Sequence, residues 1–404
     1  MQNILNNCKT LSKTGAILSL LILTLSCQSK KEFQPKVAID LAQINERGKL
    51  TAITGYSAIS YFIYRGQPMG FEYELLSQVA DSMGLDFDIV LAHDLDEMST
   101  LLNEGVGDLI AFNLTVTKQR QERVAFSEHH TLTRQVLVQR KPDNWRKMKL
   151  HEIGRELIRD PVDLIGDSVH VRKGSAYISR LQNLSEEIGG DIHIIEAPVG
   201  VTSEDLIKMV AEKEIEYAIA DQNVALINQA NYDNIDVATP VSLSQRIAWA
   251  VRKNSPELQK AINKTLKQLK SSALFNVLYN KYYKNRYAFK KRVKSEFLYV
   301  GKGNISPYDS LLQQHADSLG WDWRLLVSQV YQESQFDPTT KSWMGAIGLM
   351  QVLSRTGKMF GVTNLYDPVE NLKAGVSFLQ WLDSNWIEII PDPEERKLFI
   401  LASY

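Results

Sequence analysis

Short apolar runs alternate with amphipathic segments from Val37 to about Tyr287. Helical periodicity is clear in Phe71 to Met83, whose apolar residues fall on one helical face before Gly84 ends the segment. The apolar runs are typical of strands and comprise Leu50 to Thr54, Phe87 to Leu91, Asp108 to Asn113 and Arg134 to Gln139. Strands that alternate with helices favour a sheet covered by helices on both faces. This part is therefore predicted to be α/β.

The pattern after Pro307 is helical throughout. The spacing of Tyr308, Leu311 and Leu319 predicts an amphipathic helix that ends at Gly320, and Asp322 is a suitable N-cap for a second helix. A basic stretch between Lys281 and Lys294 precedes this part. We expect it to be a solvated helix end or linker, with contact to anionic lipid headgroups or wall polymer as the alternative.

Composition limits the classes of function. The chain has 404 residues, 44% hydrophobic and 23% charged, and a formal net charge of −1, which is typical of two or three soluble globular domains. It does not suggest a nucleic-acid partner. Both cysteines, Cys8 and Cys27, lie before the predicted domains, so neither a disulfide nor a cysteine-ligated metal site is expected there.

The N-terminus indicates export. Lys9 and Lys13 precede an apolar run from Ala16 to Leu25, which has the length of a signal-peptide core and is too short to span a bilayer. Leu25-Ser26-Cys27 resembles a bacterial lipobox, although Thr24 stands where leucine is usual. The resemblance implies lipidation of Cys27, and Gln28 and Ser29 favour an outer-membrane lipoprotein facing the periplasm. A plain cleaved signal is the alternative.

One carboxylate stands out in the second predicted helix of the C-terminal part. Leu326, Val330 and Glu333 recur at i, i+4 and i+7, so Glu333 continues a stripe that faces the core. Partial burial and the C-terminal end of the helix dipole both disfavour its charged form, as a general acid requires. A hydrogen-bonded structural glutamate is the alternative.

The sequence around Glu333 resembles a known signature. Glu333-Ser334, Ser342 and the run Gly345 to Gln351 closely resemble the lytic transglycosylase domain, which has an all-α, goose-type lysozyme-like fold. The resemblance makes Glu333 the sole catalytic acid and base. It implies that Ser342 positions the muramyl group, and that Met350, Gln351 and Tyr404 line or adjoin the glycan cleft. Asn371 and Gly375 match a later helix of that domain.

The resemblance also implies a mechanism. Ordinary glycosidases use two carboxylates, whereas here Asp337 and Asp367 are typical turn residues. A lytic transglycosylase instead forms 1,6-anhydroMurNAc without water and needs neither metal nor organic cofactor; hydrolysis by the same site is the alternative. Because the chain stops at Tyr404, before the rest of the family motif, the catalytic domain (307–404) is expected to be incomplete.

Residues Leu50 to about Tyr283 resemble family 3 solute-binding domains, which are two-lobed periplasmic amino-acid receptors. The segments that carry this resemblance are Gly70 to Leu75 and Gly107 to Ser127. It implies that Arg120 pairs with a ligand carboxylate, that Asn113 and Thr115 contact the same ligand, and that Asp221 meets its amino group. Surface charges are the alternative. Lobe two is expected at about 141–239, with hinges near Val138 and Pro240.

The combined order resembles the membrane-bound lytic murein transglycosylase F family. We expect a lipoprotein signal peptide (1–27), a linker (28–48), a regulatory solute-binding-like domain (49–287), a basic linker (288–306) and the lytic domain. The expected function is cleavage of peptidoglycan strands between MurNAc and GlcNAc, modulated by a muropeptide or amino acid. The alternative is a solute- or muropeptide-binding receptor with a lysozyme-like wall tether.

Overall fold

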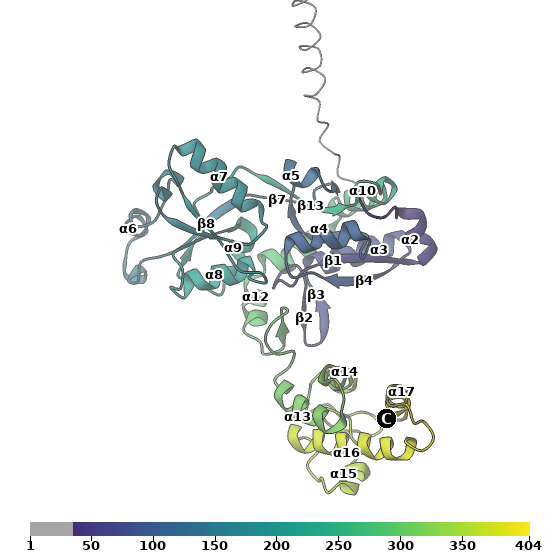
Figure 1. The fold of residues 1–404 in the computed structure, drawn as a ribbon. Coiled ribbons are helices and arrows are strands. Elements are labelled where there is room, and N and C mark those ends of the chain that lie inside the picture. Colours follow the sequence, from purple (N-terminus) through teal and green to yellow (C-terminus); the bar gives the residue numbers. More distant parts are fainter. Residues whose placement is uncertain (1–34) are drawn as a thin grey trace, which may run out of the picture.

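The computed structural model describes residues 35–404 (Figure 1). The predicted lipidation site, Cys27, lies outside the described residues. Within 35–404, no helix combines the length and the apolar character that crossing a membrane would require.

The first lobe is built on a six-stranded sheet of order β4-β1-β5-β13-β6, with β7 paired to β13. Its strands are β1 (Lys49–Thr54), β4 (Asp86–Leu91), β5 (Leu109–Thr115), β6 (Ala125–Phe126), β7 (Thr131–Thr133) and β13 (Gln245–Val251). Leu50 and Ala52 of β1 join one core cluster, whereas Ile53 joins another on the opposite face. Helices therefore cover both faces of this sheet, as the sequence predicted.

The helices of this lobe are α2 (Leu41–Arg47), α3 (Phe71–Met83), α4 (Leu95–Glu104), α5 (Lys118–Gln121) and α10 (Pro256–Lys270). The prediction for α3 is confirmed at both ends, and Gly84 closes it with a φ of 68°. That left-handed conformation favours glycine, because other residues meet a steric penalty there.

The second lobe has a five-stranded sheet of order β10-β9-β11-β8-β12. Its strands are β8 (Gln135–Arg140), β9 (Ser168–Val171), β10 (His193–Glu196), β11 (Tyr217–Asp221) and β12 (Ile235–Asp236). Its helices are η1 (Trp145–Lys147), α6 (Leu150–Arg155), η2 (Pro161–Leu164), α7 (Ala176–Ile188), α8 (Ser203–Ala211) and α9 (Gln222–Asn228).

The two crossings between the lobes differ slightly from the predicted hinges. The first lies at Arg134, between β7 and β8, so Val138 is inside a buried strand of the second lobe. The second follows Pro240, which still bridges to Val136, and precedes β13. The apolar run that suggested one strand contains the beginning of lobe two, which is why the predicted hinge fell too late.

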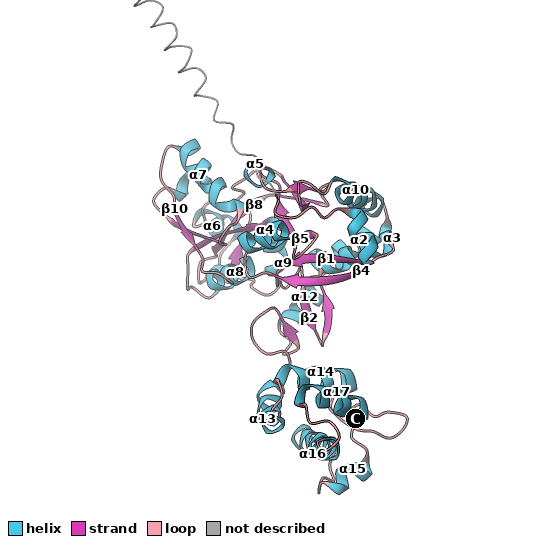
Figure 2. Cartoon of the chain, turned by 45° about the vertical axis from the view of Figure 1, so that its right-hand side comes forward, coloured by secondary structure: helices cyan, strands magenta, loops and turns pink. Residues whose placement is uncertain are grey.

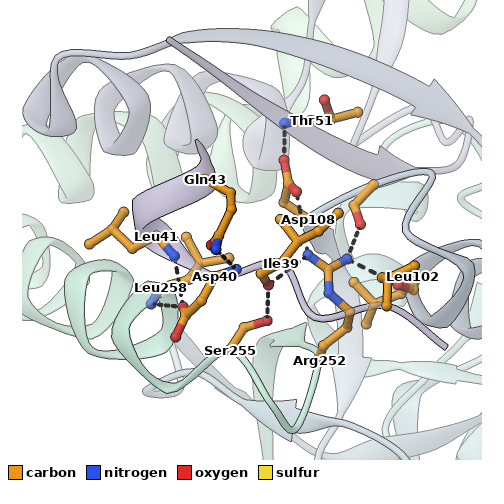
Figure 3. Close-up of polar contacts among 12 residues, drawn as sticks. Ile39, Asp40, Leu41, Gln43, Thr51, Leu102, Asp108, Arg252, Ser255 and Leu258 are labelled. Carbon is orange, nitrogen blue, oxygen red and sulfur yellow. Dashed lines mark hydrogen bonds and ion pairs between the residues drawn. The ribbon is translucent and has the colours of Figure 1, made fainter. Parts of the chain in front are cut away.

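A buried ionic network joins the beginning of the described chain to the strand that returns to lobe one (Figure 3). The side chain of Arg252 is fully buried; it donates to the carbonyl oxygens of Leu102 and Ile39 at 3.1 and 3.2 Å and lies 3.4 Å from Asp108. Asp40 caps α2 and also accepts from the backbone N–H of Leu258, in α10. These bonds hold separate chain segments in one lobe.

The basic stretch is largely structured. It follows α11 (Ala273–Tyr279) and runs through η3 (Asn280–Lys284) and α12 (Arg286–Val293). The prediction of a solvated stretch is wrong for Arg292, which is 5% exposed, lies 4.6 Å from the centre of the Phe62 ring and donates to the Ala58 carbonyl oxygen. A guanidinium group can be buried in this way because an aromatic face and a carbonyl replace water.

A small three-stranded sheet follows α12. β14 (Leu298–Tyr299) pairs with β2 (Phe62–Tyr64), which forms a hairpin with β3 (Gln67–Met69). The segment before the C-terminal part is thus fastened to the front part, and the hairpin extends toward α14 in both ribbon views (Figures 1 and 2).

The C-terminal part is helical, as predicted. It comprises α13 (Asp309–Leu319), α14 (Trp323–Ser334), α15 (Ser354–Met359), α16 (Pro368–Trp386) and α17 (Pro393–Ser403). Gly320 closes α13 in the left-handed conformation, and the Asp322 carboxylate caps α14 at the N–H of Arg324. Leu326, Val330 and Leu372 are fully buried in its core.

Candidate active site and ligand pocket

Glu333 lies in the last turn of α14. The helix ends there because Gln335 and Phe336 both adopt left-handed conformations, with φ of 52° and 65°. Such conformations are costly for residues other than glycine and occur where surrounding packing enforces them. The buried Phe336 ring supplies that packing. The turn leaves the Glu333 carboxylate at a helix end beside a loop.

The Glu333 side chain is half-buried, and burial raises the pKa of its carboxyl group. Within residues 35–404 this carboxylate makes no hydrogen bond or ion pair. A structural glutamate in such a position would be expected to hold a donor, because unpaired buried polar groups are costly. The geometry therefore favours a reactive acid over the structural alternative.

Tyr404 lies near Glu333. Burial raises the pKa of the Tyr404 hydroxyl, and the charge of Glu333 raises it further. The hydroxyl donates to the backbone carbonyl oxygen of Met350 at 2.8 Å. The structure thus brings Glu333 and Tyr404 together, and it places the tyrosine hydroxyl against the loop that carries the sequence signature.

One hydrogen bond holds that loop against α14, and another closes the segment that follows α14 on itself. The Ser334 hydroxyl donates to the Leu349 carbonyl oxygen at 2.8 Å, and the Gly348 N–H donates to the Thr340 carbonyl oxygen at 2.9 Å. Gly348 has a φ of 77°, and a Cβ there would lie 2.3 Å from the Asn371 amide. Glycine is thus required by both conformation and space.

Asn371, on α16, fixes the same loop. It is fully buried, its oxygen accepts from the Met350 N–H at 2.8 Å, and its amide donates to the carbonyl oxygens of Ile347 and Leu365 at 2.8 and 2.7 Å. The sequence placed Asn371 in a later helix without giving it a task. The structure makes it the residue that positions the loop.

The other three predicted substrate residues differ in what they contact. Met350 is a correction: its side chain is fully buried against Gly375, so it supports the wall of the site instead of lining the cleft. Gln351 is half-buried and donates to the carbonyl oxygens of Thr340 and Gly348. The Ser342 hydroxyl accepts from the Ala346 N–H at 3.0 Å.

Neither carboxylate considered as a partner for Glu333 is available for that role. Asp337 is exposed, and hydrogen bonds from Thr339 lower the pKa of its carboxyl group. Asp367 caps α16 by accepting from the N–H groups of Val369 and Glu370. Both are turn or cap residues, as the sequence predicted.

In the front part, the four predicted ligand residues line one cavity between the lobes. Asn113 and Thr115 end β5, Arg120 follows on α5, and Asp221 ends β11 of the other lobe. Arg120 donates to the carbonyl oxygen of Thr115 and, across the cleft, to that of Gly174, both at 3.0 Å. The structure thus gathers these residues as the sequence expected.

Asp221 and Ser175 carry unsatisfied oxygen atoms in this cavity. Asp221 is 6% exposed, and burial raises the pKa of its carboxyl group to about 7 against the smaller effects of Tyr177 and Arg120. Buried polar atoms without partners mark places where a ligand can supply them. Asp221 is suited to receive an ammonium group.

Sequence reasoning missed two further charged residues of the cavity, Arg172 and Glu204. Arg172 directly follows β9, and the carboxyl ends of strands are where ligands bind in open α/β sheets, which was the available signal. The cavity volume is about 40 Å³, room for a few water molecules. Leu95, Arg120 and Ser175 also line an adjoining cavity of about 340 Å³.

Contacts at two places link the front part to the chain that follows it. Gln67 donates to the Tyr331 hydroxyl on α14, and the Tyr331 ring packs so closely on Gly66 that a Cβ there would overlap it. Lys302, before the helical part, forms an ion pair with Asp205 of lobe two at 2.5 Å.

No group of three or more His, Cys, Asp and Glu side chains in residues 35–404 could hold a metal ion.

Comparisons with known proteins match both parts. The model of bacterial extracellular solute-binding proteins, family 3, matches residues 49–285, and the transglycosylase SLT domain matches residues 310–404. The membrane-bound lytic murein transglycosylase F of Desulfosudis oleivorans is 35% identical over 90% of this chain and 77% of its own length. That of Stutzerimonas stutzeri is 31% identical over 90% and 72%.

Solved structures show the fold of the front part. The amino acid ABC transporter substrate-binding protein AbpA from Streptococcus pneumoniae, bound to L-arginine, is 20% identical with a TM-score of 0.51. The match covers 63% of this chain and all of AbpA. The two-lobed binding-protein fold is therefore confirmed for the front part.

Proposed function

The chain belongs to the membrane-bound lytic murein transglycosylase F family and is a peptidoglycan lytic transglycosylase, and we propose that Glu333 is its single acid and base. The observation that carries this proposal is the half-buried Glu333 carboxyl, which has a raised pKa and no hydrogen-bond partner in the described chain. A wall tether does not need such a group, so the receptor alternative is not favoured.

The proposed reaction needs one carboxyl group in two protonation states. Protonated Glu333 donates its proton to the glycosidic oxygen between MurNAc and GlcNAc, and the bond from that oxygen to C1 of MurNAc breaks. The oxygen of the MurNAc 6-hydroxyl then bonds to C1. As it does so, the Glu333 carboxylate takes the proton of that hydroxyl. The products are a 1,6-anhydroMurNAc end and a free GlcNAc end, and no water is consumed.

The residues around Glu333 have two roles: some hold the loop beside it in place, and others are placed to contact the glycan. Met350 and Asn371 hold the loop that faces α14. Ser342, Gln351 and Tyr404 keep polar atoms near this loop, and we assign them to glycan binding. Burial is the cause of the raised pKa of Glu333.

The experiment compares wild type with Glu333→Gln on purified peptidoglycan and measures released soluble fragments. We expect the variant to lose essentially all release, because an amide cannot donate a proton to the leaving oxygen. The matched control is Glu388→Gln, an exposed carboxylate on the same domain, which should retain wild-type release. Equal release by wild type and Glu333→Gln would exclude Glu333 as the acid.

We further propose that the front part binds an amino acid or a muropeptide through Arg120, Asp221, Asn113 and Thr115. Support comes from the buried and partly unsatisfied groups of the cavity. Binding would alter access to Glu333, and the contact of the hairpin with Tyr331 offers a route.

Calorimetry with muropeptides tests the ligand proposal. Wild type should bind, and Arg120→Ala should bind at least tenfold more weakly, because a bidentate charged pair is removed. Absence of binding to wild type, or unchanged binding by Arg120→Ala, would contradict it.

For location, we propose an outer-membrane lipoprotein that faces the periplasm and is anchored through Cys27. The lipobox-like sequence supports this. In cells, Cys27→Ser should move the protein from the membrane fraction to the soluble fraction. Retention of the variant in the outer membrane would argue for another means of attachment.

A further inference from the structure

The cavity between the lobes contains two pairs of opposite charges. The first pair, Arg120 and Asp221, is the one already assigned to an amino acid. The second pair, Arg172 and Glu204, comes entirely from lobe two: Arg172 follows β9, and Glu204 lies in the first turn of α8. An amino acid with a neutral side chain would leave this second pair unused.

Arg172 is the charged group of the cavity with the fewest partners. No hydrogen bond or ion pair is made by its guanidinium within residues 35–404, although it lies close enough to Glu204 to feel its charge. Its guanidinium carbon lies 5.0 Å from the centre of the Phe112 ring, which belongs to lobe one. A guanidinium has five N–H donors, and leaving them unpaired in a partly buried site is costly.

Glu204 is already held. Its carboxylate accepts from the Ser57 hydroxyl of lobe one at 2.6 Å. It therefore balances the charge of Arg172 and leaves the donors of Arg172 free for an incoming acceptor. The planar fork of such a group fits a carboxylate in two-pronged geometry.

We propose that Arg172 binds a second carboxylate of the front-domain ligand, so that the ligand is a dicarboxylic amino acid or a short peptide with two carboxylates. This inference rests on the proposed ligand-binding function of the same cavity. Arg120 stands on lobe one and Arg172 on lobe two, so such a ligand places one carboxylate against each lobe. A dicarboxylate therefore gains more from closure than a monocarboxylate does.

The cavity measures about 40 Å³, because direct contacts between the lobes occupy the space where a ligand would bind. Arg120 donates to Gly174 and Arg172 lies on Phe112, and both contacts cross between the lobes. A ligand would replace these contacts. One of its carboxylates would accept the hydrogen bond that Arg120 now donates to the backbone, and the other would accept hydrogen bonds from Arg172.

Calorimetry on the full chain with two matched pairs of ligands tests this proposal. L-glutamate is compared with L-glutamine, and meso-diaminopimelate with L-lysine, since each pair differs at one carboxylate. Wild type should bind at least one dicarboxylate about tenfold to a hundredfold more tightly than its partner, which is the range for a charged hydrogen-bonded pair. Arg172→Met, which keeps an apolar stem over Phe112, should lose this preference, and Arg172→Lys should keep part of it.

Equal affinity within both pairs, no binding of either dicarboxylate, or a preference that survives in Arg172→Met would overturn the inference. Arg120→Met separates this failure from failure of the ligand function itself. If neutral amino acids or muropeptides bind in a way that depends on Arg120 but not on Arg172, the second subsite alone is wrong. If nothing binds, or binding ignores both arginines, the proposed function of the cavity fails as well.

Discussion

Glu72 and His130 are two buried titratable residues that take no part in either site. Glu72 accepts from the Trp249 indole N–H at 2.5 Å, and its other oxygen lies 3.7 Å from the His130 ring nitrogen. Burial raises the pKa of Glu72 to about 8 and lowers that of His130 to about 3. Both residues are therefore neutral at mildly acidic pH.

This pair predicts how stability depends on pH. As pH rises from 6.5 to about 8, folded Glu72 keeps a proton that the unfolded chain has lost, so the free energy of unfolding falls by at most about 1.4 kcal/mol per pH unit. Below pH 4.5, stability falls again with falling pH, because the unfolded chain carries a proton on His130 that the folded chain lacks until about pH 3. Between pH 4.5 and 6.5 the two effects oppose each other. Denaturant titrations across this range measure the profile.

Glu72→Gln tests whether Glu72 causes the loss of stability between pH 6.5 and 8. Glutamine still accepts from Trp249 and stays neutral, so the decline between pH 6.5 and 8 should disappear. The exposed Glu186→Gln serves as control and should keep it. A decline of the same size in Glu72→Gln would assign it to other groups.

Asn371 gives a second prediction for a single side chain. Asn371→Leu leaves three buried backbone groups unpaired and should lower the free energy of unfolding of the helical part by about 2–5 kcal/mol. Peptidoglycan release should fall with it because the loop near Glu333 loses its position. Asn385→Leu, at an exposed position of the same helix, should change either quantity little. Wild-type stability in Asn371→Leu would contradict this account.

Single residues were predictable from sequence where their setting is local. Glu333 was found from helical spacing, and its half-buried place at the end of α14 agrees. Arg172 was missed, and Met350 was misplaced, because their surroundings come from segments distant in the chain. Arg172 meets Phe112 across two lobes, and Met350 meets Gly375 on another helix.

At the scale of elements, the β2–β3 hairpin joins the front part to α14. Gly66, at the hairpin tip, has a φ of 73°, and Gly48 has a similar φ of 69° with no atom near its missing Cβ. Alanine at either position should strain the backbone and lower the free energy of unfolding by about 1–2 kcal/mol. Only Gly66→Ala should also push the Tyr331 ring aside. We expect Gly66→Ala, but not Gly48→Ala, to abolish any effect of front-domain ligands on peptidoglycan release.

Assays of release with and without ligand measure this coupling. Gly48→Ala controls for the loss of stability alone. A ligand effect that persists unchanged in Gly66→Ala would show that the hairpin does not transmit it.

The Arg252 network gives a prediction for the assembly of lobe one. Arg252→Met removes one of the two arginines that pair with the buried Asp108. It should lower the free energy of unfolding by about 3–5 kcal/mol. Arg47, which also contacts Asp108, is more exposed, and Arg47→Gln should cost no more than about 1 kcal/mol. Thermal or denaturant unfolding measures both. Equal losses would contradict the burial argument.

Most elements were predictable because their periodicity is local. The strands, α3, α13 and the start of α14 follow from apolar spacing, N-caps and stop glycines. The course of α12 was not predictable, because burial of Arg292 depends on Phe62, more than two hundred residues away. The first crossing was placed late for a similar reason, since strand pairing assigns β8 to lobe two.

At the scale of the whole molecule, a two-lobed binding part and a helical lytic part contact each other through few residues. The Lys302–Asp205 pair touches lobe two next to Glu204, and the hairpin touches α14 near Glu333. Ligand-dependent movement of lobe two can thus act on Lys302, in the segment before α13, whereas the hairpin acts on α14 itself. The order of the two parts was predictable from motifs, whereas these contacts were not.

The central claim is that one carboxyl group cleaves the glycan without water. The most direct measurement is digestion of purified peptidoglycan in water enriched in heavy oxygen, followed by mass spectrometry of the released muropeptides. We predict MurNAc ends that are one water molecule lighter than hydrolysed ends and carry no heavy oxygen, formed by wild type and absent with Glu333→Gln. Heavy oxygen at the reducing MurNAc end would show that water attacks C1 and would contradict the account.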